Sequence, residues 1–157
     1  LRTRQVLLGL RNQHKGIYMR MLGHEELTLR WGEIAPEIEK SLVHGLGDIT
    51  SYDLFIEVLK GIAQCWVLEE EDYKENRMKL KAVAMTRILT YTKYKEFVIV
   101  TTTGKGWFKY GPPILVKFEE FAKEMGCKYA SIYGRKGWAK ALPKEYKQPF
   151  TVLMKEL

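Results

Sequence analysis

Residues 118–142, FEEFAKEMGCKYASIYGRKGWAKAL, carry a helical stripe, a strand and a short helix in immediate succession. The helix starts upstream, at about residue 111, and its apolar side chains recur at helical spacing until Gly126 ends it. The segment CKYASIY then predicts a strand, and RKGWAKAL predicts a short helix. Since a strand at 96–104 precedes this stretch, we expect a strand–helix–strand crossover.

The rest of the chain supplies further helices and strands around this crossover. Two amphipathic helices are expected at 33–47, with Pro36 in the first turn, and at 49–61, with Thr50 or Ser51 as N-cap and a left-handed Gly61 at the end. Strands are expected at 63–70, 79–92, 96–104, 127–133 and 149–157. Three consecutive strands followed by a crossover predict an α/β fold, with a mixed, mostly antiparallel central sheet flanked by helices.

We expect a single core in this sheet. Eight large side chains lie on the apolar stripes or in the strands, and we predict that they are mostly buried: Trp66, Val83, Ile99, Phe118, Phe121, Ile132, Trp138 and Leu153. The two cysteines, Cys65 and Cys127, lie far apart in apolar runs, which favours two free thiols over a disulfide. No apolar run approaches the ~20 residues that a membrane span needs, so no membrane partner is expected.

Charge is distributed unevenly along the chain, whose net charge is +7. Residues 1–24 carry five cations and no carboxylate, the middle of the chain is acidic, and residues 100–157 hold 11 basic and 5 acidic side chains. Basic ends of this kind suit nucleic acid, an acidic protein surface or the phosphates of a cofactor. A merely solvated surface is the alternative.

Residues 1–30 differ from the regular pattern that follows. Apolar residues recur at roughly helical spacing, but Gly9, Gly16 and Gly23 interrupt them, and each glycine costs a helix about 1 kcal/mol relative to alanine. We therefore expect a basic N-terminal arm at 1–30, which orders against a partner, and one domain at 31–157. The alternative is a helix packed on its own domain.

Four segments of the chain resemble the GNAT superfamily of acyl-CoA-dependent acetyltransferases, and more closely the short GNAT-like proteins of bacteriophages. They are CWVL, VIVTTTGKGW, the stretch at 118–142, and the terminal FTVLMKEL. The resemblance covers about four-fifths of the chain, from residue 31 onward. It implies that two central strands splay apart and that backbone N–H groups at a helix N-terminus hold the pyrophosphate of acetyl-CoA.

The cofactor-binding residues implied by this resemblance are Thr103, Gly104, Lys105, Gly106 and Arg135. Thr101 stands where the family has Gln or Arg, and the segment WFKYG with Pro112 and Pro113 predicts that the helix begins several residues late. A long strand-to-helix loop without a phosphate cradle is the alternative reading of this segment. We therefore predict weak acetyl-CoA binding or none, and hence no cofactor unless the chain is an enzyme.

The catalytic residues are less well marked than the cofactor site. At the position of the family's tyrosine acid the sequence has Ala141, which cannot donate a proton. The substitutes nearby are Tyr133 and Tyr146 as acids, with Glu96 as a base. No metal-ligand spacing or Ser/His/Asp set is found, so no metal is expected.

The resemblance implies two alternative functions, and the basic ends of the chain leave a third open. The first is a phage protein that has lost catalysis, works as a virion-associated structural component and contacts other phage structural proteins through residues 1–30; it would reside in the virion or the host cytoplasm. The second is an active N-acetyltransferase that uses acetyl-CoA. The third is non-specific nucleic-acid binding through the basic ends.

Overall fold

The computed structural model of the 157-residue chain describes residues 16–104, 106–134 and 137–157. The elements follow one another in this order: β1 (Ile17–Met21), α1 (His24–Leu42), α2 (Ser51–Leu59), β2 (Ala63–Asp72), β3 (Arg77–Thr90), β4 (Lys95–Thr103), α3 (Gly106–Glu124), β5 (Tyr129–Ile132) and α4 (Trp138–Ala141). All five strands belong to one sheet.

The strands lie in the order β1-β2-β3-β4-β5. The first four pair with their neighbours in antiparallel fashion, and β5 pairs with β4 in parallel. α3 is the crossover between the two parallel strands. The mixed, mostly antiparallel sheet predicted from the sequence is therefore confirmed.

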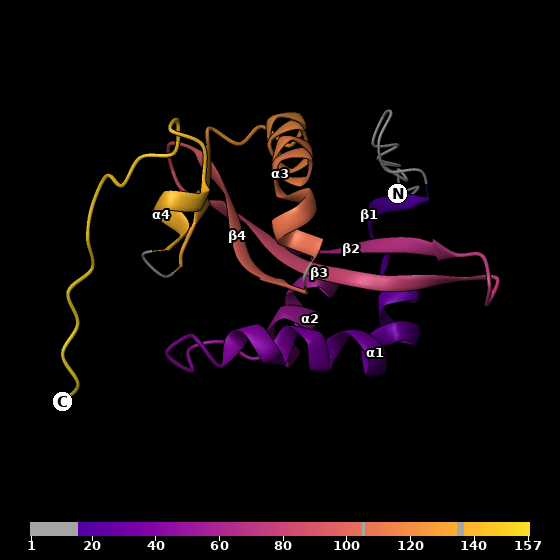
Figure 1. The fold of residues 1–157 in the computed structure, drawn as a ribbon. Coiled ribbons are helices and arrows are strands. Elements are labelled where there is room, and N and C mark those ends of the chain that lie inside the picture. Colours follow the sequence, from indigo (N-terminus) through magenta and orange to yellow (C-terminus); the bar gives the residue numbers. More distant parts are fainter. Residues whose placement is uncertain (1–15, 105, 135–136) are drawn as a thin grey trace.

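Helices cover both faces of the sheet, with α1 and α2 on one face and α3 on the other (Figure 1). On the α3 face, Trp66, Phe97 and Phe118 are buried together with side chains of β1 and β3. On the α1/α2 face, Ile34 and Leu54 pack with side chains of β2 and β3. The side chains of β2 and β3 alternate between the two cores, as expected for central strands covered on both faces.

The prediction of an N-terminal arm at residues 1–30 is wrong for residues 16–30. Residues 1–15 lie outside the described part of the chain. β1 pairs with β2 over five residues, and Ile17 and Met19 are each only 3% exposed. Gly16 (φ +85°) precedes β1, and Gly23, the N-cap of α1, lies between β1 and α1, so neither glycine lies inside a described helix. The domain therefore includes residues 16–30.

α1 is longer than predicted, because it begins at His24 and not near residue 33. Pro36 consequently lies inside the helix and not in its first turn. A proline at this position removes the hydrogen bond to the carbonyl four residues earlier, that of Gly32. Gly32 and Pro36 are both exposed, so water can satisfy that carbonyl and the helix continues.

The strand predicted at 149–157 does not form. Residues 147–157 have no regular structure, and they run away from the rest of the molecule to the C-terminal end (Figure 1). Leu153, predicted to be buried, is 92% exposed. Four of the other core predictions are confirmed, namely Trp66, Val83, Ile99 and Phe118, whereas Phe121, Ile132 and Trp138 are half-buried against the α3-face core.

Three further properties concern the described residues only. Cys65 and Cys127 are free thiols, as predicted. No helix in the described ranges is both long and apolar enough to cross a membrane. In the same ranges, no group of three or more His, Cys, Asp or Glu side chains could hold a metal ion.

Candidate functional site

β4 and β5 remain paired over only part of their length. The parallel ladder runs from Glu96 opposite Tyr129 to Ile99 opposite Ile132, whereas β4 continues to Thr103. In the described structure, residues 100–103 of β4 therefore have no β5 partner. We call these four residues the unpaired edge of β4.

A β-bulge lies at the beginning of this edge. β3 pairs Met85 with Thr101 and Thr86 with Ile99, so Val100 is the extra residue. Val100 packs against the α1/α2-face core, and the Thr101 hydroxyl forms a hydrogen bond with the hydroxyl of Ser41 on α1. Two successive side chains thus face the same helices, which an unbroken strand does not allow.

The end of β4 lies very close to β3. Thr103 is buried and its hydroxyl donates to the carbonyl of Val83 at 3.4 Å. Gly104 follows with φ +90°, and a Cβ at this position would lie 2.2 Å from the carbonyl oxygen of Lys81. Glycine is therefore required here by contact with the chain itself, whether or not a phosphate binds nearby.

α3 begins at Gly106, immediately after this turn, so the predicted late start is wrong. Pro112 and Pro113 lie at the seventh and eighth positions of the helix, where each removes one hydrogen bond within it. They do not remove the N–H groups of residues 106–109. Those N–H groups have no acceptor within the helix and lie at its partially positive end, next to the unpaired edge of β4.

The predicted base, Glu96, lies near the start of β4 and is only 8% exposed. Its Oε1 accepts hydrogen bonds from Ser131 Oγ at 2.5 Å and from the Tyr133 hydroxyl at 2.9 Å, both from the β5 segment. Glu96 thus connects the paired ends of β4 and β5. Ser131 was not identified from the sequence, since nothing local to it signals a partner 35 residues away.

The two candidate acids do not lie at one site. Burial, and then the hydrogen bond to Glu96, raise the pKa of Tyr133 to about 12. Burial and a 2.8 Å hydrogen bond to Glu119 of α3 raise the pKa of Tyr146. Both phenols therefore stay protonated at neutral pH, but each donates its proton to a different carboxylate.

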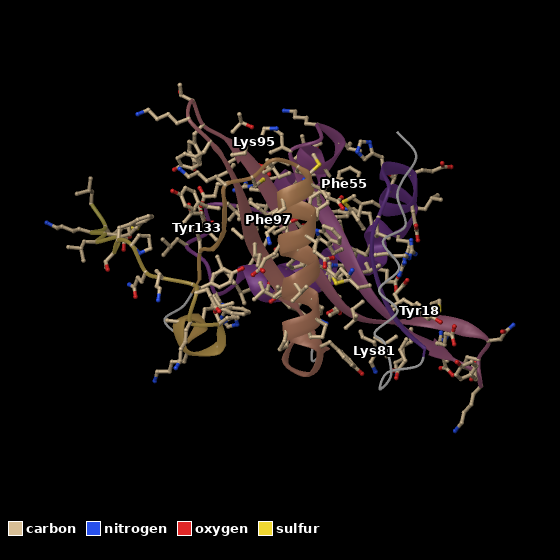
Figure 2. The ribbon with its side chains drawn as sticks, turned by 90° about the horizontal axis from the view of Figure 1, so that it is seen from above. Tyr18, Phe55, Lys81, Lys95, Phe97 and Tyr133 are labelled. Carbon is tan, nitrogen blue, oxygen red and sulfur yellow. The ribbon has the colours of Figure 1, made fainter. Side chains whose placement is uncertain are left out.

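The structure brings together only part of the predicted set. Glu96 and Tyr133 are in contact, whereas Tyr146 packs on the α3 face. Figure 2 shows Tyr133 on one side of α3, with Tyr18 and Lys81 on the other. Thr103, Gly104 and Gly106 lie where β4 ends and α3 begins. Two further candidates, Lys105 and Arg135, lie outside the described residues.

No protein-family model matches this chain, and no curated protein matches it. Several solved structures, however, are similar to it. A GNAT family acetyltransferase from Staphylococcus aureus is 16% identical with a TM-score of 0.58, covering 90% of this chain and 99% of its own. An aminoglycoside acetyltransferase from an uncultured soil metagenomic sample, in complex with sisomicin, is 13% identical with a TM-score of 0.63, covering 90% and 96%.

A predicted acetyltransferase from Clostridium acetobutylicum, solved with acetyl-CoA, is 14% identical with a TM-score of 0.58, covering 88% of this chain and 96% of its own. None of these neighbours is a bacteriophage protein by its description, and at these identities a structural likeness shows the fold alone. The chain therefore has the fold of the GNAT-family acetyltransferases.

Proposed function

We propose that this chain binds acetyl-CoA and transfers its acetyl group to an amine. One observation carries the proposal: β4 loses its β5 partner after Ile99, and α3 begins at Gly106, two residues after Gly104. A strand edge with unpaired polar groups is thereby placed beside a helix N-terminus with unpaired N–H groups. One neighbour of the same fold was solved with acetyl-CoA, which supports this choice of ligand.

The residues present fit such a ligand. The N–H groups of residues 106–109 can donate to a pyrophosphate, because the first turn of a helix offers unpaired donors and a partial positive charge. The backbone of residues 100–103 can pair with the extended, amide-containing arm of the cofactor as a strand would. Bound acetyl-CoA supplies an activated thioester, whose acetyl group forms an amide with the amine while the thiol leaves.

The described hydroxyls give little help with the departing thiol. Ala141 stands at the position of the family's acid, Tyr133 donates to Glu96, and Tyr146 donates to Glu119. A positioned general acid contributes typically ~10²–10⁴-fold in rate. We therefore propose measurable cofactor binding together with slow transfer.

Calorimetric titration of the purified chain with acetyl-CoA tests the proposal. Gly106→Pro removes one N–H group at the first helical position, where proline is well tolerated. Since a hydrogen bond to a charged group is worth about 1.5–3 kcal/mol, we expect the Kd to rise by roughly ten- to a hundredfold. His24→Pro makes the same change at the first position of α1 and should leave the Kd unchanged.

Two results would contradict the proposal. Absence of any binding heat from the native chain would remove acetyl-CoA as its ligand. Equal Kd values for the native chain and a folded Gly106→Pro variant would place the ligand elsewhere.

The virion role and the contact of residues 1–30 with phage structural proteins stay predictions from the sequence. So does residence in a virion or a host cytoplasm, and so does non-specific binding of nucleic acid. No observation on the described residues favours them over acetyl transfer.

A further inference from the structure

Four tyrosines gather at the end of the sheet where β4 begins. Tyr91 and Tyr94 lie in the turn between β3 and β4, Tyr129 begins β5, and Tyr133 follows β5. The ring centroid of Tyr94 lies 5.1 Å from that of Tyr91 and 5.1 Å from that of Tyr129. Tyr133 is connected to this group through Glu96, which accepts its hydroxyl and whose charge, after desolvation, raises the pKa of Tyr91. We call these four tyrosine side chains the tyrosine patch.

The tyrosine patch is exposed although its backbone is fixed by hydrogen bonds. The N–H of Tyr91 donates to the carbonyl of Tyr94 at 2.8 Å, and Tyr129 pairs with Glu96 in the parallel ladder. The rings are nevertheless open to solvent, with exposed fractions of 44% for Tyr91, 36% for Tyr94, 51% for Tyr129 and 55% for Tyr133. Tyrosine rings held in this way are typical of contact surfaces, because the ring offers apolar area and the hydroxyl stays wet.

Three lysines come from the same two segments as the tyrosines. Lys93 and Lys95 lie on either side of Tyr94 in the sequence, and Lys128 directly precedes Tyr129. The Lys128 ammonium lies 5.3 Å from the centroid of the Tyr129 ring. All three lysines are exposed, so their charges can reach a ligand that contacts the rings.

No carboxylate neutralises these lysines within the described ranges. None of the ion pairs found there includes one of them. The segments 91–95 and 125–134 contain no Asp or Glu. Glu96, the nearest acid in the sequence to the first segment, is buried and accepts hydrogen bonds from Ser131 and Tyr133. The tyrosine patch is therefore aromatic and positively charged at once.

We propose that the tyrosine patch binds single-stranded nucleic acid, with bases stacked on its rings and phosphates contacted by Lys93, Lys95 and Lys128. Proteins that bind single strands combine aromatic rings, which stack on any base, with cations along the sugar–phosphate backbone. A duplex would offer its phosphates but keep its bases out of reach of the rings. An acidic protein surface would pair with the lysines but has no need of four adjacent rings. The two features together favour a single strand.

This surface is distinct from the acetyl-CoA site and from the basic ends of the chain. It lies where β4 begins, whereas the unpaired edge lies where β4 ends. Lys95 and Tyr133 lie on the side of α3 away from Tyr18 and Lys81 (Figure 2). Lys93 and Lys95 belong to the acidic middle of the sequence. The inference therefore does not depend on the proposed acetyl transfer.

Fluorescence anisotropy tests the proposal with a labelled oligouridylate and a labelled oligothymidylate, each of about 20 nucleotides. We expect the native chain to bind both more tightly than a DNA duplex of the same length. Tyr91→Ala/Tyr129→Ala should raise the Kd for the single strands at least roughly thirtyfold, because stacking is lost on two rings. Tyr91→Phe/Tyr129→Phe keeps the rings and should bind like the native chain. Tyr52→Ala/Tyr73→Ala, which removes two exposed tyrosines elsewhere, is the matched control and should leave the Kd unchanged.

The salt dependence of binding tests the role of the lysines. The slope of log K against log salt concentration changes by about 0.7 for each phosphate contact on a single strand, so Lys93→Ala/Lys128→Ala should make it shallower by about 1.4. Lys60→Ala/Lys74→Ala removes two exposed lysines from other parts of the chain and should leave the slope as it is.

Three results would overturn the proposal. The first is tighter binding of the duplex than of the single strands. The second is an equal Kd for the native chain and Tyr91→Ala/Tyr129→Ala, which would assign binding to charge elsewhere, such as the basic ends. The third is no binding of either single strand, and retention of the chain by an immobilised polyglutamate peptide would then identify an acidic protein surface as the partner. The substituted side chains are exposed, so circular dichroism should show native helix and strand content for every variant.

Discussion

At the scale of single residues, Gly104 is a position where neither the backbone conformation nor the surrounding space suits a larger side chain. Its φ of +90° is rare for other residues, and a Cβ would lie 2.2 Å from the Lys81 carbonyl oxygen. Gly61 has a similar φ of +76° but open space around its Cβ position. A substitution at Gly61 therefore introduces backbone strain alone, whereas a substitution at Gly104 introduces strain and steric overlap together.

We predict that Gly104→Ala lowers the free energy of unfolding by at least about 2 kcal/mol, because left-handed strain of about 1–3 kcal/mol adds to overpacking of similar size. Gly61→Ala should cost only the strain. Urea unfolding of both variants measures the difference. Equal losses would mean that the turn at Gly104 relaxes away from β3.

Glu96 shows how a residue type alone misleads. It is the only carboxylate in the sequence segment 96–104, and this suggested a base. In the structure it accepts hydrogen bonds from Ser131 and Tyr133 where β4 and β5 are still paired. Its contacts therefore hold the two strands together, upstream of the unpaired edge of β4.

At the scale of elements, three carboxylates of α1 and α2 accept hydrogen bonds from neighbouring parts of the chain. Hydrogen bonds from Arg20 hold the pKa of Glu26 in the first turn of α1 below its usual range. Hydrogen bonds from Ser51 do the same for the pKa of Glu39, and the backbone N–H of Thr50 for the pKa of Asp53 in the capping box of α2. Each of these carboxylates is therefore more acidic in the folded chain than in the unfolded one.

A group with a lowered folded pKa stabilises the fold above its unfolded pKa, and this contribution is lost as the pH falls through the folded pKa. We therefore predict that the free energy of unfolding falls as the pH drops below about 4.5, the ordinary value for Glu26. Glu26→Gln should be less stable at neutral pH and show a shallower decline. Glu25→Gln, on the exposed side of the same turn, is the control, and identical pH curves for all three chains would contradict the assignment.

At the scale of the whole molecule, β1 is part of the compact fold. Arg20 of β1 and Arg30 of α1 both pair with the buried Glu69 of β2, at 3.3 and 2.7 Å. We predict that trypsin does not cut after Arg20 or Arg30 in the folded chain, although it cuts at both sites in urea. Mass spectrometry of a limited digest checks this prediction. Early cleavage after Arg20 would support the original prediction of an arm that extends to residue 30.

The sequence by itself determined the features that depend on neighbours along the chain. The N-cap of α2, expected at Thr50 or Ser51 and found at Thr50, the left-handed Gly61 and the periodicity of β2, β3 and β4 are local signals that the sequence carries. The helix between β4 and β5 was likewise marked by its apolar stripe. These elements were enough to predict a mixed, mostly antiparallel sheet. A short connection joins antiparallel neighbours, whereas parallel neighbours need a long crossover such as α3.

Only the tertiary structure decided the remainder. β1 is only five residues long, so its alternating pattern is too short to distinguish a strand from a helix. Its conformation is decided by pairing with β2. Pro112 and Pro113 predicted a late helix start, whereas α3 begins at Gly106 and contains both prolines. The contact of Glu96 with Tyr133 spans 37 residues. Such outcomes depend on contacts between distant parts of the chain, whose free energy exceeds the small local preferences that a sequence pattern records.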